Sequence, residues 1–183
     1  MRKKALIVLA EGFEEIEAIT TIDILRRGGI EVTITGLAEK YVKGSSNIEV
    51  IADTTIDKIA LDYDAIILPG GMPGAENLSA SKEACSLIIE MNNKKKIIAG
   101  ICASPAIMLA PLGILDNKAA TCYPGMETNF NSRTTYKEDD VVIDENIITS
   151  RGTATAMEFA FTLVKVLSGE KIANSIRSAT LAS

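Results

Sequence analysis

Continuous apolar runs alternate with amphipathic stretches along the whole chain. The runs Lys4–Ala10, Asp64–Leu68 and Lys96–Ile101 are typical of strands buried on both faces of a parallel sheet. Between them, Glu14–Arg27 and Ser81–Asn93 have helical spacing. The first of these helices is acidic at its start and basic at its end, as the helix dipole favours. The pattern therefore predicts strands and helices in regular alternation.

The same alternation continues to the end of the chain. The further expected strands are Ile30–Thr35, Ile48–Ala52, Ala119–Cys122, Val141–Asp144 and Ile147–Ser150, and the further expected helices are Pro105–Leu112 and Thr153–Leu167. Strands that alternate with helices form right-handed parallel crossovers. We therefore expect one α/β domain over residues 1–183, a three-layer α/β/α sandwich with a mostly parallel sheet. In such folds the ligand site lies at the carboxyl ends of the strands.

The composition indicates which residues build the core and which classes of binding partner are disfavoured. The 183 residues are 47% hydrophobic and 23% charged, but only 4% aromatic and without tryptophan, so Ile, Leu, Val and Ala must build the core. A net charge of -5 argues against nucleic-acid binding, which requires a concentrated basic surface. The basic clusters Arg2–Lys4 and Lys94–Lys96 each precede an apolar run, and we interpret them as solvated starts of strands.

No segment predicts export or a membrane span. The apolar run after the first basic cluster, Ala5–Ala10, is shorter than the h-region of about 7–15 residues that a signal peptide needs. No stretch approaches the roughly 18 apolar residues of a membrane helix. Three cysteines without a CxxC pair favour a reducing compartment over a disulfide framework. We expect a cytoplasmic protein.

Cys102 is the strongest candidate for a reactive group. It lies between a predicted strand and a predicted helix, with the small residues Gly100 and Ser104 two positions away on either side. A nucleophile elbow needs small residues at these positions because its turn is so sharp. Pro105 suits the first helical turn, and the amide groups of that turn would favour a thiolate. The alternative is a buried cysteine that acts as a small hydrophobic residue.

The other two cysteines lack this setting. Cys85 falls within a predicted helix, and we assign it to structure. Cys122 follows a predicted strand, so its role stays open.

Two further strand ends carry candidate groups. Glu17 is surrounded by apolar residues in the helix after the first strand, and a carboxyl group at the edge of an apolar stripe becomes a proton donor or shuttle near neutral pH; an exposed helical glutamate is the alternative. Gly70 and Gly71 follow the Asp64–Leu68 strand, where paired glycines allow close approach of a ligand and can aim amide groups at an oxyanion. A flexible turn is equally compatible with them. The Ala103 amide, next to Cys102, is a further candidate for this oxyanion role.

The chain contains no histidine. A Cys–His hydrolase dyad and a histidine-based metal site are therefore excluded. Any general acid or base must be a carboxyl group, Tyr, Lys, Cys or water.

Four segments resemble the ThiJ/PfpI superfamily, namely Leu9–Glu17 (LAEGFEEIE), Leu68–Gly71 (LPGG), Ala99–Pro105 (AGICASP) and Thr149–Gly152 (TSRG). They occur in the family's order over essentially the whole chain, and the most similar branch is that of the parkinsonism-associated protein deglycase. The resemblance implies a flavodoxin-like sandwich, usually a homodimer.

The resemblance also implies roles for particular residues. Cys102 matches the elbow nucleophile, and Glu17 matches the glutamate that, when protonated, hydrogen-bonds the thiolate. Gly70 and Gly71 match a glycine pair whose amides face the site, and Ser150-Arg151 matches a segment of the pocket and dimer interface.

One position departs from the family. Many relatives place a histidine where this chain has Tyr123, which follows Cys122. Tyrosine can donate a hydrogen bond, but with a reference pKa near 10 it is a poor base at neutral pH.

The leading functional hypothesis is a cofactor-independent enzyme, without a metal, that acts on small dicarbonyls or on glycated proteins. Cys102 would add to the aldehyde of methylglyoxal or glyoxal, Glu17 would shuttle a proton, and a hydroxy acid would be released. The alternative is a redox sensor or oxidative-stress chaperone in which Cys102 is oxidised to sulfinic acid. A protease or an amidotransferase is disfavoured because no histidine is present to activate the thiol.

Overall fold

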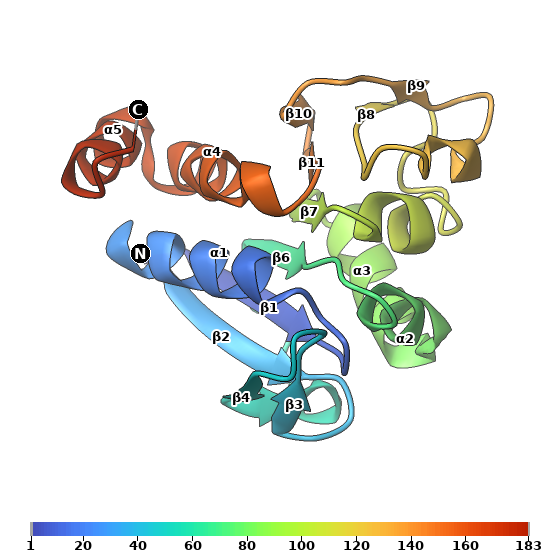
Figure 1. Ribbon diagram of the computed structural model, residues 1–183, viewed down its shortest axis with the longest axis horizontal. Helices are drawn as coiled ribbons and strands as arrows, with labels where there is room; N and C mark the ends of the chain where they lie inside the picture. The colour runs from blue at the N-terminus through green and yellow to red at the C-terminus, as the bar shows by residue number, and fades with distance from the viewer. Residues whose placement is uncertain (1, 183) are drawn as a thin grey trace.

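A central sheet of seven strands organises the molecule, which a computed structural model describes over residues 2–182 (Figure 1). Its strand order is β10-β11-β7-β6-β1-β2-β5, and only β10 runs antiparallel to its neighbour. The strands are β1 (Lys4–Leu9), β2 (Glu31–Gly36), β5 (Thr54–Thr55), β6 (Ala65–Leu68), β7 (Ile97–Ile101), β10 (Val141–Asp144) and β11 (Ile147–Ser150). The mostly parallel sheet is confirmed.

Helices cover both faces of this sheet. They are α1 (Glu15–Arg27), α2 (Gly74–Ala80), α3 (Lys82–Asn93), α4 (Ala156–Ser168) and α5 (Glu170–Ala179), with the short turns η1 (Ile56–Lys58), η2 (Pro105–Leu109), η3 (Glu127–Asn129) and η4 (Thr153–Thr155). Alternate residues of β1 enter two separate cores, one shared with α1, α4 and α5 and the other with α2, α3 and η2 (Figure 1). The three-layer α/β/α architecture predicted from the sequence is therefore confirmed.

Two of the predicted strands form outside the main sheet. Within Ile48–Ala52, β4 (Glu49–Ile51) pairs with β3 (Tyr41–Lys43) as an antiparallel hairpin. Within Ala119–Cys122, only β8 (Ala119–Ala120) is strand, and it pairs with β9 (Thr135–Tyr136). Local pattern indicates an extended segment, but the pairing partner is chosen by tertiary contacts.

The helix predictions need three corrections. The expected helix Pro105–Leu112 is a shorter π-type turn, η2, followed by further turns. Two helices were missed. α2 is only one to two turns long and begins at a glycine, while α5 starts directly after Gly169, beyond the last expected helix, Thr153–Leu167. Glycine and proline at the starts of α2 and α5 are typical of turns, so the sequence pattern does not predict the helices that follow them.

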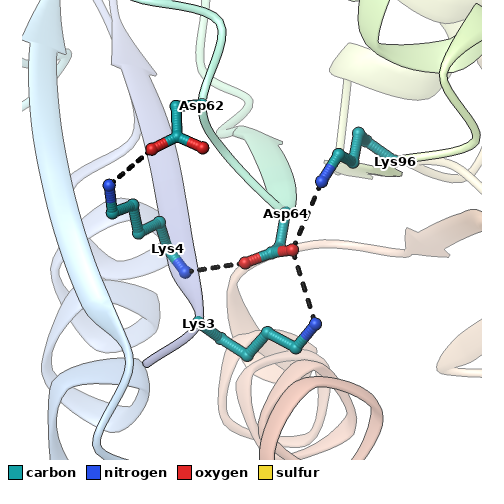
Figure 2. Close-up of polar contacts among 5 residues, drawn as sticks. All are labelled: Lys3, Lys4, Asp62, Asp64 and Lys96. Atoms are coloured by element: carbon teal, nitrogen blue, oxygen red, sulfur yellow. Dashed lines mark hydrogen bonds and ion pairs between the residues drawn. The ribbon is translucent and has the colours of Figure 1, made fainter. Parts of the chain in front are cut away.

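The basic residues at the strand starts are engaged in local pairs (Figure 2). Asp64, at the start of β6, accepts the Lys4 amide at 3.1 Å and pairs with the Lys3 and Lys96 ammonium groups at 3.4 and 3.3 Å. The Lys4 ammonium pairs with Asp62 at 2.6 Å. These contacts join the amino ends of β1, β6 and β7 on the edge opposite the strands' carboxyl ends. They support the interpretation of both clusters as strand starts.

Glu15 holds the β3–β4 hairpin against α1. One carboxylate oxygen accepts the amides of Ser46 at 2.7 Å and Ile48 at 3.3 Å, and the other accepts the Ser45 hydroxyl at 3.2 Å. Burial alone would raise the pKa of Glu15, but hydrogen bonds from its own amide and from these loop groups outweigh burial and lower it. No sequence pattern indicates this role, because a glutamate in the first turn of a helix is common.

We expect Glu15→Gln to lower the free energy of unfolding at pH 7 by about 1–2 kcal/mol, because hydrogen bonds to a charged acceptor are replaced by neutral ones. In the wild type this contribution is lost as the pH falls below the ordinary value of 4.5, since the lowered pKa makes the ionised form the stabilising one. Urea unfolding at pH 7 and pH 4 measures both effects. Glu49→Gln, on the exposed side of the same hairpin, is the control; an equal loss in both variants would contradict the anchoring role.

Candidate active site

Cys102 lies on a sharp turn between β7 and η2. Its φ of 64° is in the left-handed region, which non-glycine residues rarely adopt without a functional constraint. Its amide donates to the Ser150 carbonyl at 2.9 Å, and its carbonyl accepts the Tyr123 amide at 2.8 Å. Pro105 begins the helical turn. The strand–elbow–helix geometry predicted from the sequence is therefore present.

Small residues on both sides make this elbow possible. A Cβ on Gly100 would lie 3.1 Å from a side-chain carbon of Leu109, which is tight. Ser104 is fully buried, and its hydroxyl donates to the Pro69 carbonyl at 2.5 Å. This bond ties the elbow to the loop that carries the glycine pair. Sequence reasoning used Ser104 only for its size, and nothing in the pattern indicates its hydrogen bond.

Glu17 is fully buried in the first turn of α1, where its Oε2 accepts the Gly70 amide at 2.8 Å. Its Oε1 is buried with no N–H or O–H partner among residues 2–182. We expected Glu17 at the edge of an apolar stripe, but Ile16 and Ile19 are 56% and 43% exposed. The helix thus turns a carboxyl group inward and two isoleucines outward. The side chain of Glu14 caps α1 by accepting the Glu17 amide at 2.8 Å, a role that the three-residue spacing could have indicated.

The glycine pair is required by close packing. A Cβ on Gly70 would lie 2.6 Å from the Cβ of Cys102 and 2.9 Å from Oε2 of Glu17. Gly71 has a φ of 89°. The Gly70 amide is already bonded to Glu17, so it is not free for an oxyanion as we expected. The amides of Ala103 and Gly71 instead lower the pKa of the Cys102 thiol, so they favour negative charge on its sulfur.

The two acidic groups of the site are coupled. Burial raises the pKa of Glu17 to about 7, against hydrogen bonds from Gly70 and Cys102 that lower it. Burial, followed by the charge of Glu17, raises the pKa of Cys102 to about 12, so the lowered thiol pKa expected from the helix terminus alone is wrong. Because each negative charge disfavours the other, the pair retains at least one proton throughout the neutral range. The site is built to pass a proton between sulfur and carboxylate.

The remaining candidates are two cysteines and two residues of a neighbouring loop and strand end. Cys122 is fully buried, and burial together with Glu127 raises the pKa of its thiol to about 12. Tyr123 and Arg151 line one open cavity of about 270 Å³. Cys85 is half-buried in α3 and packs against the core that α2, α3 and η2 share.

The part of the chain that the structure describes contains neither a metal-binding cluster nor a membrane helix. Residues 2–182 hold no group of three or more His, Cys, Asp or Glu side chains arranged to bind a metal ion. No helix in that range is long and apolar enough to cross a membrane.

Comparisons with known proteins all match this chain to one protein family, over nearly its whole length. The model of the DJ-1/PfpI family matches residues 3–166. The chain is 37% identical over 181 residues to the Parkinson disease protein 7 homolog of Danio rerio, covering 96% of this chain and 95% of that protein. It is also 34% identical over 177 residues to a Caenorhabditis elegans protein named "Glutathione-independent glyoxalase DJR-1.2", covering 96% and 94%. The crystal structure of Drosophila melanogaster DJ-1beta superposes with a TM-score of 0.96 at 37% identity, covering all of both chains.

Proposed function

The chain belongs to the DJ-1/PfpI family, and on this premise we propose that it is a cofactor-independent cysteine enzyme that converts methylglyoxal or glyoxal to the corresponding hydroxy acid. The observation that carries the proposal is the buried Glu17 carboxyl group, which has a pKa of about 7 and lies with Cys102 against the same glycine, Gly70. A general base works best when its pKa is close to the operating pH. The glyoxalase name of one relative supports the same reaction class.

In the first step Glu17 accepts the proton of the Cys102 thiol while the sulfur forms a bond to the aldehyde carbon. The carbonyl oxygen gains the negative charge and then the proton, which gives a hemithioacetal. The amides of Gly71 and Ala103, which favour negative charge on the sulfur, stabilise charge as it moves between sulfur and oxygen.

In the second step Glu17, again ionised, removes the hydrogen of the former aldehyde carbon to give an enediolate. Returning that proton to the neighbouring carbon yields a thioester of the 2-hydroxy acid. Water then cleaves the thioester, which restores the thiol and releases the acid. The sum is addition of one water to the oxoaldehyde, with no external oxidant or reductant.

The same chemistry applies to dicarbonyl adducts on proteins. A hemithioacetal on a protein cysteine, or an aminocarbinol on lysine or arginine, releases its aldehyde reversibly, and Cys102 would capture that carbon. We therefore include glycated proteins among the proposed substrates, which makes deglycation a variant of the same reaction.

The test is formation of lactate from methylglyoxal by the purified protein, without glutathione and with a chelator present. Enzymatic lactate production that is proportional to protein concentration is the expected result. Unchanged methylglyoxal at high protein concentration, with all thiols reduced, would refute the proposal.

A second candidate function is oxidative sensing through Cys102. The thiol is partly exposed, and the Gly71 and Ala103 amides favour negative charge on its sulfur. The buried Oε1 of Glu17 has no N–H or O–H partner among residues 2–182, and when Glu17 is protonated it can donate a hydrogen bond to a sulfinate. One equivalent of peroxide would oxidise the thiol, with Glu17 accepting its proton, to sulfenic acid, and a second would give sulfinic acid, each releasing water. Intact-protein mass spectrometry after mild peroxide treatment should find two added oxygens confined to Cys102. Oxidation spread over Cys85, Cys122 and methionines would exclude this role.

We also propose that the chain acts as a homodimer. Ile16 and Ile19 of α1 are exposed, and Ile48, whose amide is bonded to the neighbouring Glu15, is 57% exposed beside them. Clustered exposed isoleucines mark an interaction surface. Sedimentation velocity is expected to give a dimer for the wild type and a monomer for Ile16→Glu. A monomeric wild type at micromolar concentration would refute this proposal.

A further inference from the structure

Ser104 carries a polar group that the elbow itself does not require. A nucleophile elbow needs a small residue two positions after the nucleophile, and glycine or alanine would satisfy that need. Ser104 instead places a hydroxyl group where the residue has no exposed surface. A buried hydroxyl group without a partner is costly, and this one donates to the Pro69 carbonyl at 2.5 Å, at the short end of the range for such bonds. The role of the hydroxyl group therefore follows from the carbonyl that it contacts.

That carbonyl belongs to the same peptide unit that binds Glu17. The carbonyl of Pro69 and the N–H of Gly70 are the two ends of one peptide bond, which is trans and planar. The Gly70 N–H donates to Oε2 of Glu17 at 2.8 Å. In a trans peptide the carbonyl and the N–H point in opposite directions, so a bond that fixes the carbonyl also fixes the direction of the N–H. Ser104, this peptide and Glu17 therefore form one hydrogen-bonded chain.

The hydrogen-bonded chain is shielded from water. Ser104 and Glu17 are fully buried, and Pro69 and Gly70 are buried as well. In such an environment consecutive hydrogen bonds polarise one another, because a donor at the carbonyl strengthens the N–H of the same peptide as a donor. The Ser104 hydroxyl group thus strengthens the bond that the ionised form of Glu17 accepts, and that bond lowers the pKa of Glu17 against the effect of burial.

We propose that Ser104 is a positioning residue for Glu17, which fixes and strengthens, through the Pro69–Gly70 peptide, the hydrogen bond that holds the Glu17 carboxylate. This inference rests on the proposed function, in which Glu17 is the general base. Ser104 touches neither the substrate nor the reacting sulfur in this role. It acts only on how readily Glu17 is ionised and where its carboxylate lies.

Two other titratable groups act on Glu17, and both remain when the Ser104 hydroxyl group is removed. They are the thiol of Cys102 on the elbow and the carboxyl group of Glu14 on the helix of Glu17 itself. The Glu14 amide also donates to the Gly70 carbonyl at 2.9 Å, which holds the glycine loop from its other side. Loss of the hydroxyl group is therefore expected to weaken one hydrogen bond without removing a charge or releasing the loop.

The experiment measures the pKa of Glu17 by carbon-13 NMR titration of glutamate carboxyl groups in the wild type, Ser104→Ala and Ser104→Gly. The Glu17 signal is assigned by its absence in Glu17→Gln. Both Ser104 variants keep a small residue at the elbow, and circular dichroism establishes that each is folded. We expect the pKa of Glu17 to rise by about 0.5–1 unit in both, because a weaker hydrogen bond to the ionised form favours the protonated form.

Thr35→Val is the matched control for loss of a buried hydroxyl group. Thr35 is fully buried, and its hydroxyl group donates to the Thr54 carbonyl at 3.5 Å. It lies on β2, three strands away from β7 in the sheet, which corresponds to about 14 Å. This variant should keep the wild-type pKa of Glu17, whatever stability it loses. A hydroxyl group that served stability alone at position 104 would likewise leave that pKa unchanged.

Turnover of methylglyoxal gives a second readout. If the pKa of Glu17 rises as expected, kcat/KM of Ser104→Ala falls about 3- to 10-fold at pH 6 and returns to the wild-type value at pH 9, where Glu17 is ionised in both proteins. An equal reduction at both pH values would contradict the positioning role.

The outcomes separate this inference from the proposed function. If the wild type does not turn over methylglyoxal, the function fails, and the NMR titration still decides whether Ser104 acts on Glu17. An unchanged pKa of Glu17 in folded Ser104→Ala and Ser104→Gly would overturn the inference and leave the function standing.

Discussion

Cys102→Ser is expected to lower lactate formation from methylglyoxal by about 10³-fold or more, to the rate of buffer alone. Serine keeps the shape of the side chain, so the elbow and the contact with Gly70 should survive. A hydroxyl group is a much weaker acid than a thiol, and Glu17, with a pKa of about 7, cannot take its proton to any useful extent. The variant would therefore lose the nucleophile without losing the fold.

Cys85→Ser is the matched control, because Cys85 is half-buried in α3. Its sulfur donates a hydrogen bond to the Ser79 carbonyl, which a serine hydroxyl can also donate. It should retain wild-type turnover. Circular dichroism and thermal unfolding of both variants establish that each is folded. Substantial lactate formation by folded Cys102→Ser would mean that the carbon–sulfur bond of the proposed reaction is not formed.

Glu17→Gln is expected to reduce kcat/KM by about 10²- to 10⁴-fold, the usual contribution of a positioned general base. The amide oxygen of glutamine can still accept the Gly70 hydrogen bond, so the loss reports proton transfer more than packing. In the wild type kcat/KM should rise with pH through about 7, as Glu17 becomes ionised and able to accept the thiol proton. The variant should lack this inflection. An unchanged pH profile would place the general base elsewhere.

The same variant should change how stability depends on pH. The folded pKa of Glu17, about 7, lies above the ordinary value of 4.5. As the pH rises from 4.5 to 7, the unfolded chain releases this proton while the folded chain keeps it, so stability is lost across that interval. A difference of 2.5 pKa units corresponds to about 3 kcal/mol.

Glutamine removes this cost. Glu17→Gln is therefore expected to gain about 3 kcal/mol relative to the wild type between pH 4 and pH 8, measured by urea unfolding. A variant that becomes less active and, at high pH, more stable is the signature of a carboxyl group buried for catalysis. A constant stability difference across the pH range would contradict the raised pKa.

The fold could be predicted in outline because its signals are local. Continuous apolar runs such as those of β1 and β6 indicate strands that are covered on both faces, and a three-layer sandwich follows from their alternation with helices. The segments that differed, β4 and β8, pair outside the main sheet, β4 with the adjacent β3 in a hairpin and β8 with β9. α2 was hidden by its glycine start. Local propensity indicates an extended segment but does not choose its pairing partner.

The features of the candidate site are likewise of two kinds, those that local sequence predicts and those that tertiary contacts set. The sequence by itself determined that Cys102 lies on an elbow, because the small residues around it and the strand–helix change are contiguous. Only the tertiary structure decided its chemical state. Glu17, Gly70 and Cys102 come from three separate strand ends, and their contact buries both the carboxyl group and the thiol. Burial, followed by the charge of Glu17, raises the pKa of the thiol instead of lowering it. Burial and charge coupling act through space, over a few ångströms between distant parts of the chain, and no local pattern records them.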